Sequence, residues 1–196
     1  MRRKIIEALL IIVCFILQCT VFQTLSLAGI VPNLLLIVTS SLGFMRGEKE
    51  GMAVGFFSGL LTDIFFGQLF GFYSLLYMFL GYGSGLFHRM FYDEDIKLPM
   101  VWIALSELVY GLSVYFFLFL LRSRFQFGFY FAHIILPELV YTVVVTFVFY
   151  RVIRSLNHWL EKKEKEEDKL EKKKMKEKEN KEKEEDRYKE EKKFEN

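Results

Sequence analysis

The sequence has few of the residues that most often bind metals or carry out catalysis. It contains two cysteines and three histidines in 196 residues. His88, His133 and His158 do not show the spacing of metal ligands, and neither a GxxxxGK(S/T) phosphate-binding loop nor a GxSxG nucleophile motif occurs. We therefore predict no metal site, no cofactor and no catalytic residue, and we expect that the chain is not an enzyme.

A cleavable signal sequence and a disulfide are also not indicated. The N-terminal MRRK precedes an apolar run that continues to about Ala28 without an A-x-A-like cleavage site, so we interpret the run as a retained first helix. Cys14 and Cys19 both lie within this run, on different faces of a helix. They are most simply interpreted as buried thiols.

Apolar residues are abundant, and they are confined to one part of the chain. Hydrophobic residues make up 53% of the sequence, including 22 Phe, yet 26% of the residues are charged. The long apolar runs lie in residues 1–160, whereas residues 161–196 are almost all charged, with the two signs in balance. About 20 apolar residues span a bilayer as a helix. We therefore predict a multi-pass membrane domain at 1–160 and a charged cytoplasmic tail at 161–196.

The apolar part contains six runs that we interpret as membrane-spanning helices: residues 5–27, 31–46, 51–66, 71–90, 98–121 and 129–153. Lys and Arg in the short connecting segments set the orientation. With the N-terminus inside, the cytoplasmic side receives Arg2, Arg3, Lys4, Arg46, Lys49, Arg89, Lys97, Arg151 and Arg154, whereas the opposite side receives only Arg122 and Arg124. We therefore predict an all-α six-helix bundle in a cytoplasmic membrane, with both termini in the cytoplasm.

Small residues recur at every fourth position of the third predicted span, at Gly51, Gly55, Gly59, Asp63 and Gly67. On a helix these positions form one stripe that lets another backbone approach closely, which is the small-xxx-small pattern of membrane helix packing. An aspartate costs about 2.5–3.5 kcal/mol at mid-depth in a membrane, so it should face protein or water. Asp63 is therefore the first functional candidate, and a helix-end carboxylate that reaches surface water is the alternative.

The flanks of this stripe add further packing candidates. Gly71 follows it closely, and Gly81 and Gly85 form a second GxxxG pattern in the fourth span.

Pro32 and Pro137 lie near the outer ends of the second and sixth spans, where we expect a proline to begin a helix without losing a hydrogen bond.

Two more carboxylates, Glu107 and Glu138, fall within the fifth and sixth spans, and no Lys or Arg shares their depth. We expect them to be either uncharged or hydrogen-bonded to hydroxyls such as those of Ser106, Tyr110 or Tyr141. They indicate either polar contacts that hold helices together, or a path for a proton or substrate.

The charged tail alternates blocks of Glu and Lys, and pairs such as Glu161 and Lys165 have the spacing that supports a solvated helix. Leu170 and Met175 stand nearly alone as apolar residues, so the tail does not indicate a coiled coil. We expect a frayed charged helix or disorder. Its lysines could attract anionic lipid, but the interspersed acids weaken this, and we expect no nucleic-acid partner.

Four segments together resemble one protein family. They are VPNLLLIV at 31–38, GFFSGLLTDIFFGQLFGFYSL at 55–75, LGYGSGLF at 80–87, and PELVYT from Pro137. In these segments the chain resembles the rod shape-determining protein MreD family over roughly residues 1–155. Pro32, Asn33, Pro137 and Tyr141 belong to the matching motifs, whereas Thr142, where an Asn is expected, and the charged tail depart from them.

The resemblance implies a small bacterial inner-membrane protein whose fold is similar to the substrate-binding subunits of energy-coupling-factor vitamin transporters. It further implies partners in lateral-wall peptidoglycan synthesis: MreC, which spans the membrane once, the MreB filament, a RodA-type glycosyltransferase and a class B penicillin-binding transpeptidase. The function expected from it is a non-enzymatic scaffold in the cell-shape complex.

Two rival functions remain open at this point. The first is the substrate-binding subunit of a small-molecule importer, with Asp63 or Glu107 as a polar anchor for the ligand. Such subunits usually present an AxxxA-like face on the first helix to their energising partner, and the first span of this chain does not show one. The second is a proton-coupled carrier, which would need Glu107 or Glu138 to titrate during transport. In the scaffold, by contrast, the glycine stripe packs against a neighbouring helix of the bundle or against a single-span partner.

Overall fold

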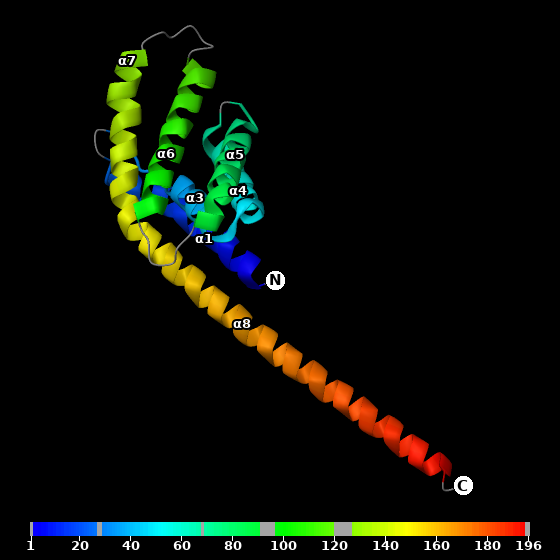
Figure 1. Cartoon of the computed structure of the whole chain (residues 1–196). Helices are drawn as coiled ribbons and strands as arrows, with labels where there is room; N and C mark the ends of the chain where they lie inside the picture. The colour runs from blue at the N-terminus through cyan, green and yellow to red at the C-terminus, as the bar shows by residue number, and fades with distance from the viewer. Residues whose placement is uncertain (1, 27–28, 68, 91–96, 120–126, 195–196) are drawn as a thin grey trace. The chain divides into compact units, whose positions relative to one another are not determined.

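The computed structural model describes residues 2–26, 29–67, 69–90, 97–119 and 127–194, and these residues form helices without any strand (Figure 1). The helices are α1 (Arg2–Cys19), α2 (Val21–Thr24), α3 (Leu34–Arg46), α4 (Glu48–Phe66), α5 (Phe72–Leu86), α6 (Lys97–Val114), α7 (Phe127–Tyr130) and α8 (Leu136–Phe194). A 3-10 helix, η1 (Phe87–Met90), follows α5, and π-helical segments occur at η2 (Tyr115–Phe119) and η4 (Phe131–Ile135). The expected all-α class is confirmed.

Within the described residues, three helical stretches are long and apolar enough to cross a membrane: Arg3–Thr24, Lys97–Phe117 and Phe127–Lys178. Leu34–Arg46 is a shorter apolar helix. Each of the six predicted spans overlaps helical residues, and residues 27, 120 and 121 of the first and fifth spans lie outside the described residues. Because α3 and α5 have 13 and 15 residues, they fall below the roughly 20 residues of a full crossing. The count of six spans therefore stays a prediction.

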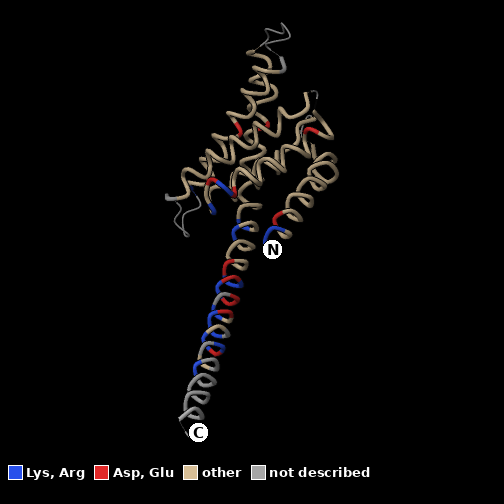
Figure 2. Tube along the Cα trace, turned by 90° about the vertical axis from the view of Figure 1, so that its right-hand side faces the viewer, with Lys and Arg blue, Asp and Glu red and all other residues tan. Residues whose placement is uncertain are grey.

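The chain divides into two compact units, Met1–Ile153 and Arg154–Asn196. Figure 2 shows that acidic and basic residues are sparse in the first unit, whereas both signs crowd the described residues of the second. In the second unit α8 stays helical to Phe194. Local contacts there join Asn157 Nδ2 to Glu161 Oε1 at 2.9 Å and place Lys163 Nζ 4.2 Å from the centre of the Trp159 ring.

Helix α3 lies at the centre of the first unit, where it contacts α1, α4, α5 and α6. Every residue from Leu34 to Met45 is buried, including the hydroxyl residues Thr39, Ser40 and Ser41. A helix that is apolar on nearly all sides must be surrounded by other helices. Other core side chains come from the helices that contact α3, such as Ile11, Val54, Tyr77 and Ile103, and from α8, at Val145, Tyr150 and Ile153.

Pro137 does not begin its helix, so the expectation for this residue is wrong. The helical run starts at Phe127, and Pro137 follows the π-helical segment Phe131–Ile135. Proline has no N–H to donate within a helix, and its ring crowds the preceding turn. A π-helical turn widens the backbone immediately before the proline, which is a usual place for such an irregularity. Pro32, in contrast, lies just before α3.

Helices α4 and α5 form an antiparallel hairpin in which backbone meets backbone (Figure 1). A side chain added at Gly51 would meet the Gly81 carbonyl, one at Gly55 the Tyr77 carbonyl, and one at Gly59 the Tyr73 carbonyl. Gly85 lies equally close to the backbone of Glu48. The small-residue faces of both helices thus contact each other within this chain, so this stripe leaves no room for a partner's helix.

We predict that Gly81→Ala destabilises the protein by about 1–3 kcal/mol, because the new methyl group overlaps the Gly51 carbonyl and forces the hairpin apart. The matched control is Gly83→Ala in the same helix, where the nearest atom would be Trp102 Cζ2 at 3.9 Å. Its stability should be unchanged or higher by up to about 1 kcal/mol, since alanine favours helix. Thermal unfolding in one detergent compares the two variants, and equal stability would contradict this packing of α4 on α5.

Candidate functional site

The Asp63 carboxylate binds the first turn of α5. Its Oδ1 accepts a hydrogen bond from the Tyr73 N–H at 3.0 Å, and its Oδ2 accepts from the Ser74 N–H at 2.8 Å and from the Ser74 hydroxyl at 2.5 Å. The side chain is 3% exposed. Asp63 therefore contacts protein, not the surface water of the alternative expectation.

The local sequence explains why α5 needs this carboxylate. The first N–H groups of a helix have no acceptor within the helix, and a side chain at the N-cap usually supplies one. The N-cap of α5 is Gly71, which has no side chain and adopts a left-handed φ of +91°. Asp63 substitutes for the missing cap from the neighbouring helix, and its negative charge lies at the positive end of the α5 dipole. Gly67, which ends α4, donates its N–H to the Asp63 carbonyl.

A second polar junction joins three helices at Asn33. Its Oδ1 accepts from the Leu36 N–H at 3.1 Å, which caps α3, and from the Tyr77 hydroxyl of α5 at 2.7 Å. Its own N–H donates to Thr142 Oγ1 of α8 at 3.1 Å. Asn33, Tyr77 and Thr142 are all buried. The family-motif residue Asn33 is therefore a hydrogen-bond centre of the bundle, and Thr142, which departs from the motif, still supplies an acceptor.

The other motif residues lie around this junction. Pro32 is buried beside Asn33, and Pro137 is half-buried in the turn that precedes Tyr141. The Tyr141 hydroxyl donates to the Leu25 carbonyl at 3.1 Å.

Sequence reasoning missed Tyr77, although a hydroxyl in an otherwise apolar span is the signal that could have identified it.

Glu107 and Glu138 lie close enough to each other to interact electrostatically. Glu107 is 2% exposed, and neither of its carboxylate oxygens has a hydrogen-bond partner within the part of the chain that the structure describes. Of the two alternatives expected for Glu107, a hydrogen bond accepted from Ser106, Tyr110 or Tyr141 is therefore not found among the described residues. Among the described residues, no three His, Cys, Asp or Glu gather as metal ligands would.

A polar pocket, which we call the tyrosine pocket, lies at the end of the bundle where α1 and α4 end and α5 begins. Its volume is about 210 Å³. Polar groups from several helices line it, together with apolar side chains: Gln18, Cys19, Gln23, Val31, Thr62, Phe66, Tyr73 and Tyr110. Gln18 Oε1 accepts from the Leu35 N–H at 3.3 Å, which ties one wall of the pocket to α3.

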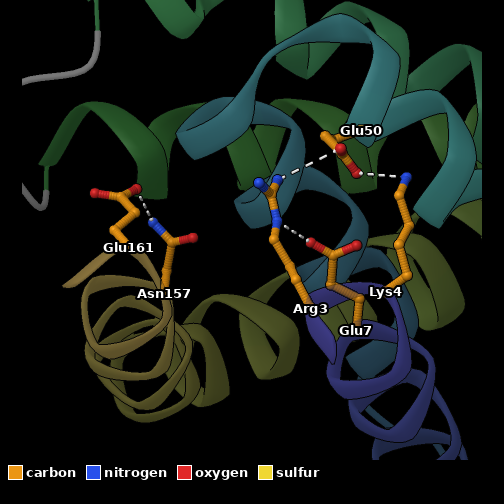
Figure 3. A network of polar contacts seen from close by, with 6 residues as sticks. All are labelled: Arg3, Lys4, Glu7, Glu50, Asn157 and Glu161. Atoms are coloured by element: carbon orange, nitrogen blue, oxygen red, sulfur yellow. Dashed lines mark hydrogen bonds and ion pairs between the residues drawn. The ribbon is translucent and has the colours of Figure 1, made fainter. Parts of the chain in front are cut away.

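The opposite end of α1 carries a charged cluster (Figure 3). Arg3 Nε lies 2.9 Å from Glu7 Oε1, and Arg3 Nη2 lies 3.4 Å from Glu50 Oε1. Lys4 Nζ lies 3.3 Å from Glu50 Oε2. The two basic and two acidic side chains connect α1 to the first turn of α4. Glu7 is buried, Arg3 and Glu50 are partly buried, and Lys4 is exposed, so the cluster fixes how the two helices align at the edge of the bundle.

An apolar groove of about 440 Å³ runs from this cluster along α1 and α4. Its floor and walls are Lys4, Glu7, Ala8, Ile11, Ile12, Ala53, Val54, Phe57, Leu60, Leu61 and Ile64. Ala8 and Ala53 are its smallest side chains, so the backbone is most accessible there. We call this the α1–α4 groove.

We predict that Asp63→Ala lowers the free energy of unfolding by about 1–3 kcal/mol, because the α5 amides and Ser74 then lose their acceptor while buried. Asp63→Asn retains one acceptor oxygen and should lose less. Thr62→Val is the matched control, since the Thr62 hydroxyl donates to the Ser58 carbonyl of its own helix. Unfolding in detergent measures all three. If the Asp63→Ala protein were as stable as the control, the result would contradict the capping of α5 by Asp63.

The apolar part of the chain matches one known family. Residues 2–159 match the family described as rod shape-determining protein MreD. No curated protein matches the chain, and no solved structure does so either. The family match covers the whole apolar part, including the Asn33 and Asp63 junctions, and stops where the charged tail begins. The chain therefore belongs to the MreD family of bacterial membrane proteins, which are named for determining rod shape.

Proposed function

We propose that this protein is a non-enzymatic membrane component of the cell-shape complex. In this role it binds an MreC-like single-span protein and scaffolds the lateral-wall peptidoglycan synthases, a RodA-type glycosyltransferase and a class B penicillin-binding transpeptidase. The observation that carries the proposal is the family match over residues 2–159. The chemistry of wall synthesis then belongs to the partners.

The α1–α4 groove is the surface that we assign to the single-span partner. The glycine stripe of α4 is covered by α5, so a partner must dock elsewhere. The groove is lined mainly by apolar side chains, and Ala8 and Ala53 allow a second helix to approach closely. Its charged end, at Lys4 and Glu7, supplies polar groups where a membrane helix would leave the hydrocarbon.

The test is a pull-down of the tagged protein from its own membranes in a gentle detergent, with bound proteins identified by mass spectrometry. We expect a single-span MreC-like protein and wall synthases, and we expect Ala53→Phe to lose them because it fills the groove. The control is Leu9→Phe, an exposed position of α1 outside the groove lining. Recovery of a transmembrane coupling subunit with paired ATPases would contradict the scaffold in favour of an importer.

We further propose six spans with both termini in the cytoplasm, which the distribution of Lys and Arg supports. Single cysteines in a protein with Cys14 and Cys19 replaced by alanine test the orientation. A membrane-impermeant thiol reagent should label Phe70→Cys in intact cells, since Phe70 is 78% exposed between α4 and α5. Glu48→Cys, at the exposed start of α4, should react only after permeabilisation. The reverse pattern would invert the proposed orientation.

A further inference from the structure

We propose that the tyrosine pocket binds a small organic ammonium group. The pocket has a volume of about 210 Å³, below the range of roughly 300–1,000 Å³ for drug-sized ligands. It therefore fits a ligand of few heavy atoms. Four observations on its walls favour a cation over an anion or a neutral molecule.

The first observation is that helices end at the pocket. The helical stretch that begins with α1 ends at Thr24, next to the lining residue Gln23, and the lining residue Phe66 is the last residue of α4. The C-terminal end of a helix carries about half a negative charge from its unpaired carbonyl groups. Helices α3 and α5 also begin here, but side chains already accept from their first N–H groups: Gln18 and Asn33 for α3, and Asp63 for α5. The backbone around the pocket thus favours positive charge.

The second observation is a set of aromatic rings on the pocket walls: Phe66, Tyr73 and Tyr110. The ring centres of Tyr73 and Tyr110 are 6.3 Å apart. The face of an aromatic ring attracts an ammonium group, and the attraction is stronger where water is excluded. Rings on separate helices, α4, α5 and α6, can contact one cation from different sides.

The third observation is acidic side chains behind these rings. Glu138 lies close enough to interact electrostatically with Tyr73 and with Tyr110, and Asp63 interacts with Tyr73 in the same way. Glu107 lies one turn from Tyr110 on α6 and is buried with both oxygens lacking a partner among the described residues. A buried carboxylate without a donor is costly and is stabilised by a nearby cation.

The fourth observation is the polar lining itself. The amides of Gln18 and Gln23 and the hydroxyls of Thr62, Tyr73 and Tyr110 can accept hydrogen bonds from an ammonium group. None of the lining residues that the structure describes is Lys, Arg or His. An anionic ligand would therefore find no cation in the pocket walls.

Two sources supply such a group: a soluble amine, or the headgroup of a lipid such as phosphatidylethanolamine. Both present the same ammonium chemistry. The pocket lies at the ends of α1 and α4, where a lipid headgroup and an aqueous solute can both reach it. Ammonium binding does not depend on the cell-shape role, because the pocket is built from the residues of this chain.

The test uses the full-length protein in nanodiscs of phosphatidylglycerol, which has no amine, with empty nanodiscs as the blank. Choline is the probe, and 3,3-dimethylbutan-1-ol is its neutral isostere with carbon in place of nitrogen. We expect calorimetric titration to show at least tenfold tighter binding of choline, and choline to raise the unfolding temperature more than the isostere does. Equal binding of the two, or no binding of choline, overturns the proposal.

Variants locate the site. Phe66→Leu removes a ring that is 59% exposed, so the fold should tolerate it, and choline affinity should fall by about two- to fivefold. Glu138→Gln should also weaken choline binding. Phe70→Leu, an exposed ring outside the lining, is the matched control and should leave affinity unchanged. Unchanged affinity in Phe66→Leu and Glu138→Gln together would place the bound choline elsewhere and overturn the assignment.

A second set of nanodiscs separates the two sources. If phosphatidylethanolamine reaches the pocket, its inclusion should weaken choline binding by competition, while the isostere stays unaffected. If only soluble amines enter, choline should bind equally well in both membranes. Either result supports ammonium binding and identifies its source.

Discussion

The close antiparallel contact between α4 and α5 is the constraint on which the rest of the bundle depends. Within a membrane there is little hydrophobic drive to bring helices together, so association relies on close packing and buried polar contacts. Gly51, Gly55 and Gly59 provide the packing, and Asp63 provides the polar contact at the end of the same stripe. Both helices of the hairpin in turn pack against the buried helix α3.

Two of the described polar side chains, Asn33 and Asp63, join helices of the bundle. Asn33 connects α3 to Tyr77 of α5 and Thr142 of α8, and Asp63 connects α4 to α5. Such contacts fix the positions of the helices and leave the outer faces apolar. The α1–α4 groove and the tyrosine pocket are spaces that this packing leaves open. We propose that the groove binds a membrane helix and that the pocket binds a small cation.

The sequence predicted the helical class and the small-residue stripe, because helix periodicity and apolar run length are local properties. It could not identify α5 as the helix that covers the stripe, since helix pairing depends on packing in three dimensions.

Asp63 was recognised as unusual, yet its acceptor role depends on the absence of a cap at Gly71, in a different helix. Pro137 was misplaced because the preceding helical segment, which begins at Phe127, carries no strong sequence signal for a π-helical turn. Thr142 was identified as a departure from the family motif, and its hydroxyl accepts the Asn33 N–H as an amide oxygen would.

Hydrogen exchange at the Tyr73 and Ser74 amides tests the central contact most directly. The first amides of a helix normally exchange readily because they lack partners within the helix. In the full-length protein in nanodiscs, we predict that these two amides exchange as slowly as those in the middle of α5, and that Asp63→Ala restores rapid exchange while the middle of α5 stays protected. Rapid exchange of both amides in the wild-type protein would show that Asp63 does not cap α5, and would contradict the central role of the α4–α5 contact.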